Sequence, residues 1–244
     1  MKGFIKSFLE MFNYRLSKID SNYVNYPIEQ TNEGILNDFL EKQSVSLVLD
    51  IGANVGQWAN EIRESGYGKK IISVEPLTSA FSVLSSNCSE DTFWTCQNFA
   101  VGNCDTTSEI NISKNSVSSS LLPMLDSHIE AAPESLFYQK EKIQILKLDS
   151  IAKQSVNIND IVFLKIDTQG YEKIVLDGAK DLLKQTVGIQ LEMSFDPLYR
   201  GEINFTKLKI FLESLGFILF HIQNGFRHSK SQELMQVDTI FMRK

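Results

Sequence analysis

The feature that most constrains this chain is a series of short apolar runs separated by segments with helical periodicity. Four runs read as buried strands: Leu47–Leu49, Lys70–Val74, Ile161–Ile166 and Val187–Leu191. Continuously apolar strands are typical of a parallel sheet that is covered on both faces. Parallel neighbours can be joined only by crossover connections, and helical segments lie between these runs. The pattern therefore predicts an α/β fold with a mostly parallel sheet.

The remaining elements follow from periodicity and from breaking residues. Helices are expected over Glu33–Lys42, Trp58–Glu64, Ser79–Ser86, Glu172–Lys184 and Phe205–Ser214. Further strands are expected over Phe93–Val101, Glu109–Ser113 and Ile143–Leu148. Two final strands, Phe217–Ile222 and Val237–Met242, predict a terminal hairpin.

The domain organisation is expected to be simple. No linker rich in Pro, Gly or Ser divides the 244 residues, so we expect an N-terminal helical segment over 1–45 and one domain over 46–244. The segment carries apolar residues at helical spacing near its start, and it could dock on the domain, on a second subunit in a homo-oligomer, or on a membrane surface. Docking on protein is favoured because amphipathic helices generally bury against protein. No run approaches the ~18 apolar residues of a transmembrane helix.

Charge and cysteine usage narrow the function classes. The net charge of −6 comes without any long Lys/Arg cluster, which disfavours nucleic acid as a partner because phosphate neutralisation supplies most of that affinity. Cys88, Cys96 and Cys104 show neither a CxxC pair nor a metal-ligand spacing. This usage favours reduced thiols in a cytoplasmic protein.

Polar side chains gather at the ends of the expected strands. Right-handed crossovers bring the carboxyl ends of parallel strands to one edge of the sheet, where ligands bind in a crevice. The residues at or near such ends are Asp50, Glu75, Asn98, Asp167 and Glu192. Their convergence predicts a binding site at this edge.

The segment DIGANVG, from Asp50 to Gly56, predicts a tight loop between a strand and a helix. Gly52 and Gly56 allow a sharp turn and a close approach of ligand to backbone, and Asn54 lies between them. The pattern is GxNxG rather than GxGxxG and no P-loop Lys follows, so a dinucleotide and a nucleoside triphosphate both fit poorly. Asp50 would repel a phosphate but could hold an ammonium group.

Glu75 ends the second strand, 23 positions after Gly52. This is the usual place for a carboxylate that binds both ribose hydroxyls of an adenosine ligand. Asn98, near the end of the third strand, either contacts adenine or caps the strand end. S-adenosylmethionine carries an ammonium, a sulfonium and a ribose but no phosphate, so it fits these residues.

Together these motifs resemble the FkbM-type methyltransferase family. The segments that carry the resemblance are Val48–Gly56, Ser73–Pro76, Phe163–Glu172 and Ile189–Ser194. The resemblance implies a Rossmann-like class I methyltransferase fold, with a seven-stranded sheet whose C-terminal strand is antiparallel. It also implies S-adenosylmethionine as methyl donor and O-methylation of a hydroxyl on a sugar, glycan or natural product. Ser116–Leu122 resembles the family's serine-containing loop, which implies that Ser120 lies near the cofactor.

Asp167 and Glu192 mark the expected reactive end. In methyltransferases that resemble catechol O-methyltransferase, carboxylates at these strand ends hold a divalent cation, so Mg²⁺ on Asp167 and Glu192 is one expectation. The other is that Asp167 acts directly as a general base or orienting group. Lys165 lies two positions before Asp167, on the same strand face, and could pair with either carboxylate.

Two alternatives compete with a methyltransferase. A non-catalytic S-adenosylmethionine-binding protein would need Asp50 and Glu75 but nothing at Asp167 and Glu192. A nicotinamide-dependent oxidoreductase is less favoured because GxGxxG is absent. Fold alone does not guarantee activity.

Overall fold

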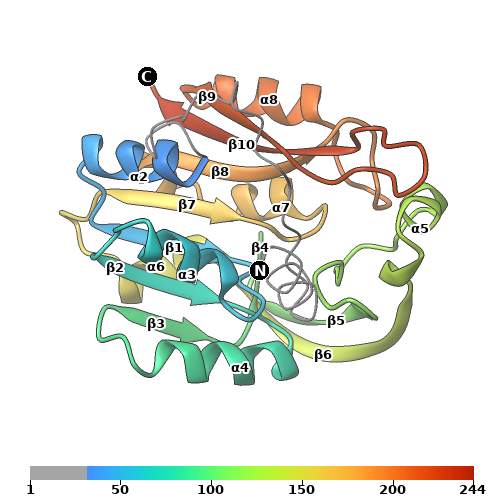
Figure 1. The fold of residues 1–244 in the computed structure, drawn as a ribbon. Coiled ribbons are helices and arrows are strands. Elements are labelled where there is room, and N and C mark those ends of the chain that lie inside the picture. Colours follow the sequence, from blue (N-terminus) through green and yellow to red (C-terminus); the bar gives the residue numbers. More distant parts are fainter. Residues whose placement is uncertain (1–31) are drawn as a thin grey trace, which may run out of the picture.

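Two sheets organise residues 32–244, the part of the chain that this computed structural model describes (Figure 1). The expectations for the segment before residue 32 lie outside the described residues. The main sheet has seven strands in the order β3-β2-β1-β7-β8-β10-β9. Their bounds are β1 Leu47–Ile51, β2 Lys70–Val74, β3 Trp94–Gln97, β7 Val162–Ile166, β8 Thr186–Ser194, β9 Phe217–Asn224 and β10 Gln236–Arg243.

The strand directions confirm the expected Rossmann-like α/β fold. β3, β2, β1, β7 and β8 pair in parallel. β10 pairs antiparallel with both β8 and β9, so the last strand lies between two strands that precede it in the chain. The terminal hairpin and the antiparallel C-terminal strand are thus both confirmed.

Successive side chains of a strand point to opposite faces of the sheet, so the buried strands place apolar residues on both faces. Helices cover each face. Val48 and Phe163 point to the face covered by α2 (Asn32–Lys42), α3 (Gln57–Glu64) and α4 (Thr78–Cys88). Leu49 and Leu164 point to the opposite face. That face is covered by α6 (Leu148–Ser155), α7 (Glu172–Asp177) and α8 (Phe205–Ser214).

A second sheet, in the order β4-β6-β5, was not anticipated. It lies on the side toward which the arrows of β1, β2 and β7 point in Figure 1, together with the short helix α5. The bounds are β4 Ala100–Gly102, β5 Thr106–Ser113, β6 Phe137–Lys147 and α5 Asp126–Ala131. This sheet closes one side of the edge at which the parallel strands end.

The single strand expected over Phe93–Val101 is wrong. β3 pairs with β2 in the main sheet, whereas β4 pairs with β6 in the second sheet. Between them, the Asn98 amide donates to the main-chain oxygens of Glu75 and Pro76 at 2.9 and 3.0 Å. This link fixes the chain where it leaves one sheet for the other.

The helix expected over Glu172–Lys184 is shorter than predicted. It ends before Gly178, and a short 3-10 helix follows at Leu182–Lys184. A Cβ at Gly178 would lie 2.1 Å from the main-chain oxygen of Gly102, so the chain there packs directly on β4. The close approach requires glycine and separates the two helical pieces.

Candidate functional site

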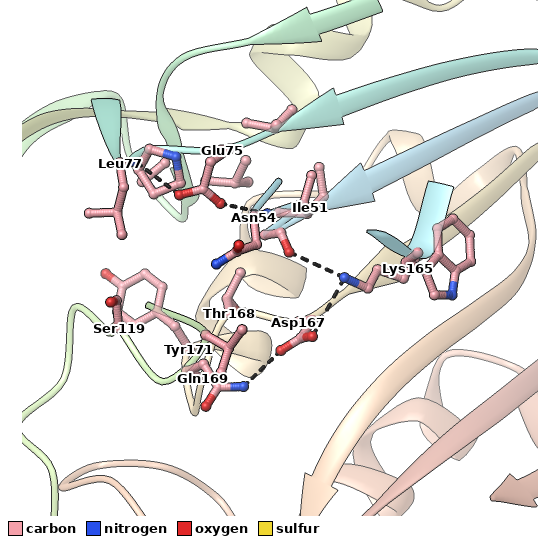
Figure 2. Close-up of a pocket in the computed structure, with 18 of the residues that line it drawn as sticks. Ile51, Asn54, Glu75, Leu77, Ser119, Lys165, Asp167, Thr168, Gln169 and Tyr171 are labelled. Carbon is pink, nitrogen blue, oxygen red and sulfur yellow. Dashed lines mark hydrogen bonds and ion pairs between the residues drawn. The ribbon is translucent and has the colours of Figure 1, made fainter. Parts of the chain in front are cut away.

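A cavity of about 270 Å³ lies at the carboxyl ends of the parallel strands, next to the second sheet. Its wall includes Gly52, Asn54, Glu75, Asp167, Tyr171 and Asp238. Figure 2 shows Asn54 from the glycine loop, Glu75 after β2, and Lys165 and Asp167 from β7 and its end converging there. The position confirms the expected edge, and the size is near the lower end of the usual range for small-molecule sites.

The glycine loop has the close packing that its sequence predicts. Gly52 has a φ of +80°, and a Cβ there would lie 1.8 Å from the main-chain oxygen of Asp167. Gly56 has a φ of +91° and packs on Leu84 and Trp94, away from the cavity wall. Asn54 adopts a φ of +48° and lines the cavity. Gly52 and Asn54 therefore face the ligand space, whereas Gly56 shapes the loop from behind.

Glu75 is almost fully buried at the end of β2 and lines the cavity. Its Oε1 accepts the N–H of Leu77 and its Oε2 accepts the N–H of Asn54, both at 2.9 Å. Burial raises the pKa of Glu75 to about 7, against the lowering effect of these two hydrogen bonds. The carboxylate is held in place and still has lone pairs for hydroxyl donors in the cavity.

Asp50 lies behind the cavity wall rather than on it. Its side chain is fully buried and accepts the Ser73 hydroxyl at 2.9 Å. Lys165 places its Nζ 3.3 Å from Asp50 Oδ1. The ammonium that Asp50 holds is thus that of Lys165, and Asp50 has no direct access to a cofactor in this structure.

Lys165 joins the glycine loop to the reactive end. Besides Asp50, its Nζ donates to the main-chain oxygen of Gly52 at 3.2 Å and lies 3.6 Å from Asp167 Oδ2. Burial by itself would lower the pKa of Lys165, but Asp50 and Asp167 outweigh it and raise that pKa. The expected Lys165–Asp167 pair is present, and the side chain stays charged.

Asp167 directly follows β7, as predicted, whereas Glu192 lies within β8, which continues to Ser194. The Gln169 amide lies between the two carboxyl groups. Gln169 Nε2 donates to Asp167 Oδ1 and to Glu192 Oε2, both at 2.8 Å. The Gln236 amide donates to the same Glu192 oxygen at 3.0 Å. Burial, and then the nearby charges of Asp167 and Asp238, raise the pKa of Glu192. Asp167 lines the cavity, with 39% of its side chain exposed, whereas Glu192 lies behind it.

This arrangement does not fit the expected Mg²⁺ site. An N–H donor occupies the space between the two carboxylates, where a cation would need oxygen ligands. Within the described residues, no group of three or more His, Cys, Asp or Glu side chains is placed to hold a metal ion. Asp167 and Glu192 therefore do not form a site for a divalent cation in this arrangement.

Asn98 and Ser120 are close to the cavity but not on its wall. Asn98 has the capping contacts described above, so the structure favours the strand-end cap over an adenine contact. Ser120 is fully buried, and its hydroxyl donates to the main-chain oxygen of Gln169 at 2.7 Å. Its neighbours Ser116 and Ser119 line the cavity instead, so the serine-containing loop does reach the site.

Sequence reasoning missed several lining residues. Much of the wall that lies farthest along the sheet from Glu75 is formed by Trp58, Gln190, Gln223 and Asp238. One signal could have found two of them, because Gln190 and Asp238 are polar residues inside otherwise buried strands. Trp58 and Gln223 give no comparable signal.

Residues 50–219 match the FkbM methyltransferase domain, a range that contains the glycine loop, Glu75, Asp167 and Glu192. The chain belongs to this family. The resemblance drawn from the motifs is thereby confirmed.

The comparison with solved structures found similar chains at low sequence identity. A methyltransferase FkbM from Methylobacillus flagellatus KT is 14% identical with a TM-score of 0.49; the match covers 80% of this chain and 43% of that one. TehB from Haemophilus influenzae is 9% identical, with a TM-score of 0.48 and coverages of 97% and 66%. Aeropyrum pernix fibrillarin with bound S-adenosyl-L-methionine is 9% identical, with a TM-score of 0.44 and coverages of 81% and 66%.

The chain therefore spans less than half the length of the Methylobacillus protein. The comparison with curated proteins found no match.

None of the helices between residues 32 and 244 is long and apolar enough to cross a bilayer. The three cysteines are free thiols, as expected.

Proposed function

We propose that this protein transfers a methyl group from S-adenosylmethionine to a hydroxyl of a small molecule or glycan. The observation that carries the proposal is that two of the carboxylates lining one cavity lie in different surroundings. Glu75 is buried and fixed by two main-chain N–H groups, whereas Asp167 is partly exposed beside a lysine. The first suits binding of ribose hydroxyls, and the second suits proton transfer.

The cofactor end of the site is formed by Gly52, Asn54 and Glu75. Gly52 lets a ligand approach the backbone, and Glu75 accepts hydrogen bonds from a ribose. The apolar residues Leu77, Phe99 and Leu121 also line the cavity and suit an adenine ring. When bound, S-adenosylmethionine supplies an electrophilic methyl group: its C–S bond breaks as the O–C bond forms, and S-adenosylhomocysteine leaves.

At the reactive end, Asp167 accepts the proton that the attacking hydroxyl loses. Lys165 is a positioning residue, because its ammonium contacts both Asp167 and the glycine loop. Glu192 is also a positioning residue, because it reaches Asp167 only through the Gln169 amide. Alignment of the acceptor with the methyl group is expected to supply much of the rate, since orientation alone is worth ~7–11 kcal/mol.

The test compares cofactor binding with turnover in Asp167→Asn. S-adenosylmethionine affinity, measured by calorimetry, should be retained, while kcat falls by ~10²–10⁴-fold, the usual cost of losing a general base. The acceptor is first found by mass spectrometry with a panel of sugar and natural-product alcohols. Asp181→Asn, on an exposed carboxylate paired with Lys184, is the matched control and should keep full kcat.

Three results would contradict the proposal. Full turnover in Asp167→Asn would mean that the base lies elsewhere. Tight binding of NAD without binding of S-adenosylmethionine would favour an oxidoreductase. Loss of activity with a chelator, restored by Mg²⁺, would show that a cation joins the site despite the Gln169 amide.

A further inference from the structure

The cavity continues past Asp167 along the sheet, away from Glu75. Glu75 follows β2, whereas Gln190, Asp238 and Gln223 come from β8, β10 and β9 on the other side of β7. In register, Gln190 lies beside Lys165, and Asp238 lies between Glu192 and Gln223. Lys165 and Gln190 therefore form one polar row across the sheet. A second row on the same face consists of Glu192, Asp238 and Gln223. Both rows lie next to Asp167, the proposed base. We call this part of the wall the β8–β10 end.

Gln190 provides an unsatisfied hydrogen-bond acceptor at this end. The residue is 9% exposed and lines the cavity, and no group among residues 32–244 donates a hydrogen bond to its buried Oε1. A buried acceptor without a donor is unfavourable, and most such groups in proteins are paired. A ligand that brings an O–H or N–H donor would satisfy it.

The charge at this end is predominantly negative. Asp167, Asp238 and Glu61 line the cavity. The one lysine on this wall, Lys165, already contacts Asp50 and Asp167. Burial and then the charge of Asp167 raise the pKa of Asp238 to about 6. A phosphate or carboxylate would be repelled here, whereas a cation would be attracted.

Trp58 adds an aromatic surface to the polar one. Its ring stacks parallel to Phe163, with centroids 6.5 Å apart, and lines the same cavity. A smaller hollow of about 40 Å³ shares Trp58, Glu61, Gln190 and Gln223 and extends toward α2. The Lys165 ammonium already lies over this ring, 5.9 Å from its centroid. The ring therefore adds apolar contact surface, and the β8–β10 end has room for more than a single hydroxyl.

We propose that the β8–β10 end is the acceptor subsite, and that its occupant is a polyol with a protonated amine and no anionic group. Gln190 and Asp238 are the residues that determine this specificity. Gln190 accepts a donor from the acceptor, and Asp238 pairs with its ammonium. The inference rests on the proposed methyl transfer, because Asp167 joins this end to the cofactor end.

The experiment uses three matched probes, the methyl glycosides of glucosamine, glucose and glucuronic acid. Their binding to the full chain, saturated with S-adenosylhomocysteine, is measured by ligand-observed NMR titration. We expect the amine to bind most tightly and the carboxylate least. Gln190→Leu and Asp238→Asn should each weaken binding of the amine by roughly 10- to 100-fold, the scale of a lost charged hydrogen bond.

Gln144→Leu on β6 and Asp181→Asn are the matched controls, both on exposed side chains, and should bind like the unmodified protein. Gln190→Leu should fold, because it removes an unpaired buried oxygen, and its melting temperature checks this. Equal binding of the glucuronide and the amine, unchanged binding in both test variants, or no binding of any probe would overturn the proposal. Calorimetry with S-adenosylhomocysteine is read separately, so a failure of the cofactor site is distinguished from a failure of the acceptor subsite.

Discussion

At the scale of single residues, Gly52 shows how strictly the site constrains its backbone. It combines a left-handed φ with a contact that leaves no room for a Cβ. Gly201 has a similar φ of +96° but open space around its Cα. Substitutions at the two positions therefore separate the free-energy cost of a left-handed backbone from the cost of the steric contact with Asp167.

We expect Gly201→Ala to lose ~1–2 kcal/mol, the cost of a left-handed L-residue, and to keep its cofactor affinity. Gly52→Ala should lose more, because the added methyl group displaces the main chain at Asp167, and it should not bind S-adenosylmethionine. Thermal unfolding and calorimetry measure both effects. Similar losses of stability and affinity in the two variants would contradict this prediction, because they would show that the main chain at Asp167 can move to accommodate the added methyl group.

The titration of Glu75 predicts how cofactor affinity depends on pH. Burial raises its pKa to about 7, and in the proposed cofactor site the ionised form is the one that accepts two ribose hydroxyls. The competent fraction therefore rises with pH, and affinity should increase about tenfold from one pH unit below the pKa to one unit above. Calorimetry over this range is the measurement. The Glu75→Gln variant is the control, because its affinity changes with pH only through titration of the ligand and of other groups. An equal change of affinity with pH in both proteins would contradict the prediction.

Residue patterns predicted some contacts and could not predict others. Glu75 was placed correctly on the cavity wall because its position depends on one strand and one loop. Asp50 was expected to hold a ligand's ammonium, but Lys165 lies beside it in register on β7 and takes that place. The Gln169 amide likewise enters between Asp167 and Glu192. Such pairings depend on the registry of strands far apart in sequence.

At the scale of elements, the start of α8 offers a simple stability test. Asn204 precedes the helix, and its side chain accepts the N–H of Lys207 at 3.2 Å. Asn204→Ala should lose ~0.5–2 kcal/mol because that N–H loses its partner. Asn204→Asp should be stable, since Asp caps equally well. Chemical unfolding checks both, and equal stability of the Ala and Asp variants would show that the cap contributes nothing.

Elements that depend on local pattern were predicted well, and those that depend on tertiary pairing were not. The bounds of β2 and α8 agree with the periodicity of their residues. Phe93–Val101 reads as one strand, but its two halves find partners in different sheets. In the second sheet, β5 and β6 are partly exposed, and their polar residues give a weak hydrophobic signal.

At the scale of the whole molecule, buried carboxyl groups predict that the unliganded protein is less stable at higher pH. The pKa of Glu75 is raised to about 7, that of Glu172 to about 8 and that of Asp238 to about 6, in each case mainly by burial. Between about pH 5 and pH 8, the folded state therefore binds more protons than the unfolded chain. The stabilisation is full below the unfolded pKa values and is lost as pH rises through the folded ones.

Thermal unfolding without ligand should thus show a melting temperature that falls from about pH 5 to about pH 8. Each kcal/mol lost corresponds to about 2–4 °C for a domain of this size. Glu172→Gln should reduce the slope because it removes one of the titrating groups. A melting temperature that rises over this interval would contradict the assignment of these groups as buried acids.

The position of β10 between β8 and β9 also determines the order in which the sheet can be completed during synthesis. β9 leaves the ribosome before β10, yet β10 is its ladder partner in the main sheet. Until the final strand emerges, β8 has an open edge beyond β7, and β9 has no neighbour through which to join it. The part of the sheet that carries Gln223 and Asp238 is therefore assembled last, after β1, β2, β7 and β8 are already available to pair.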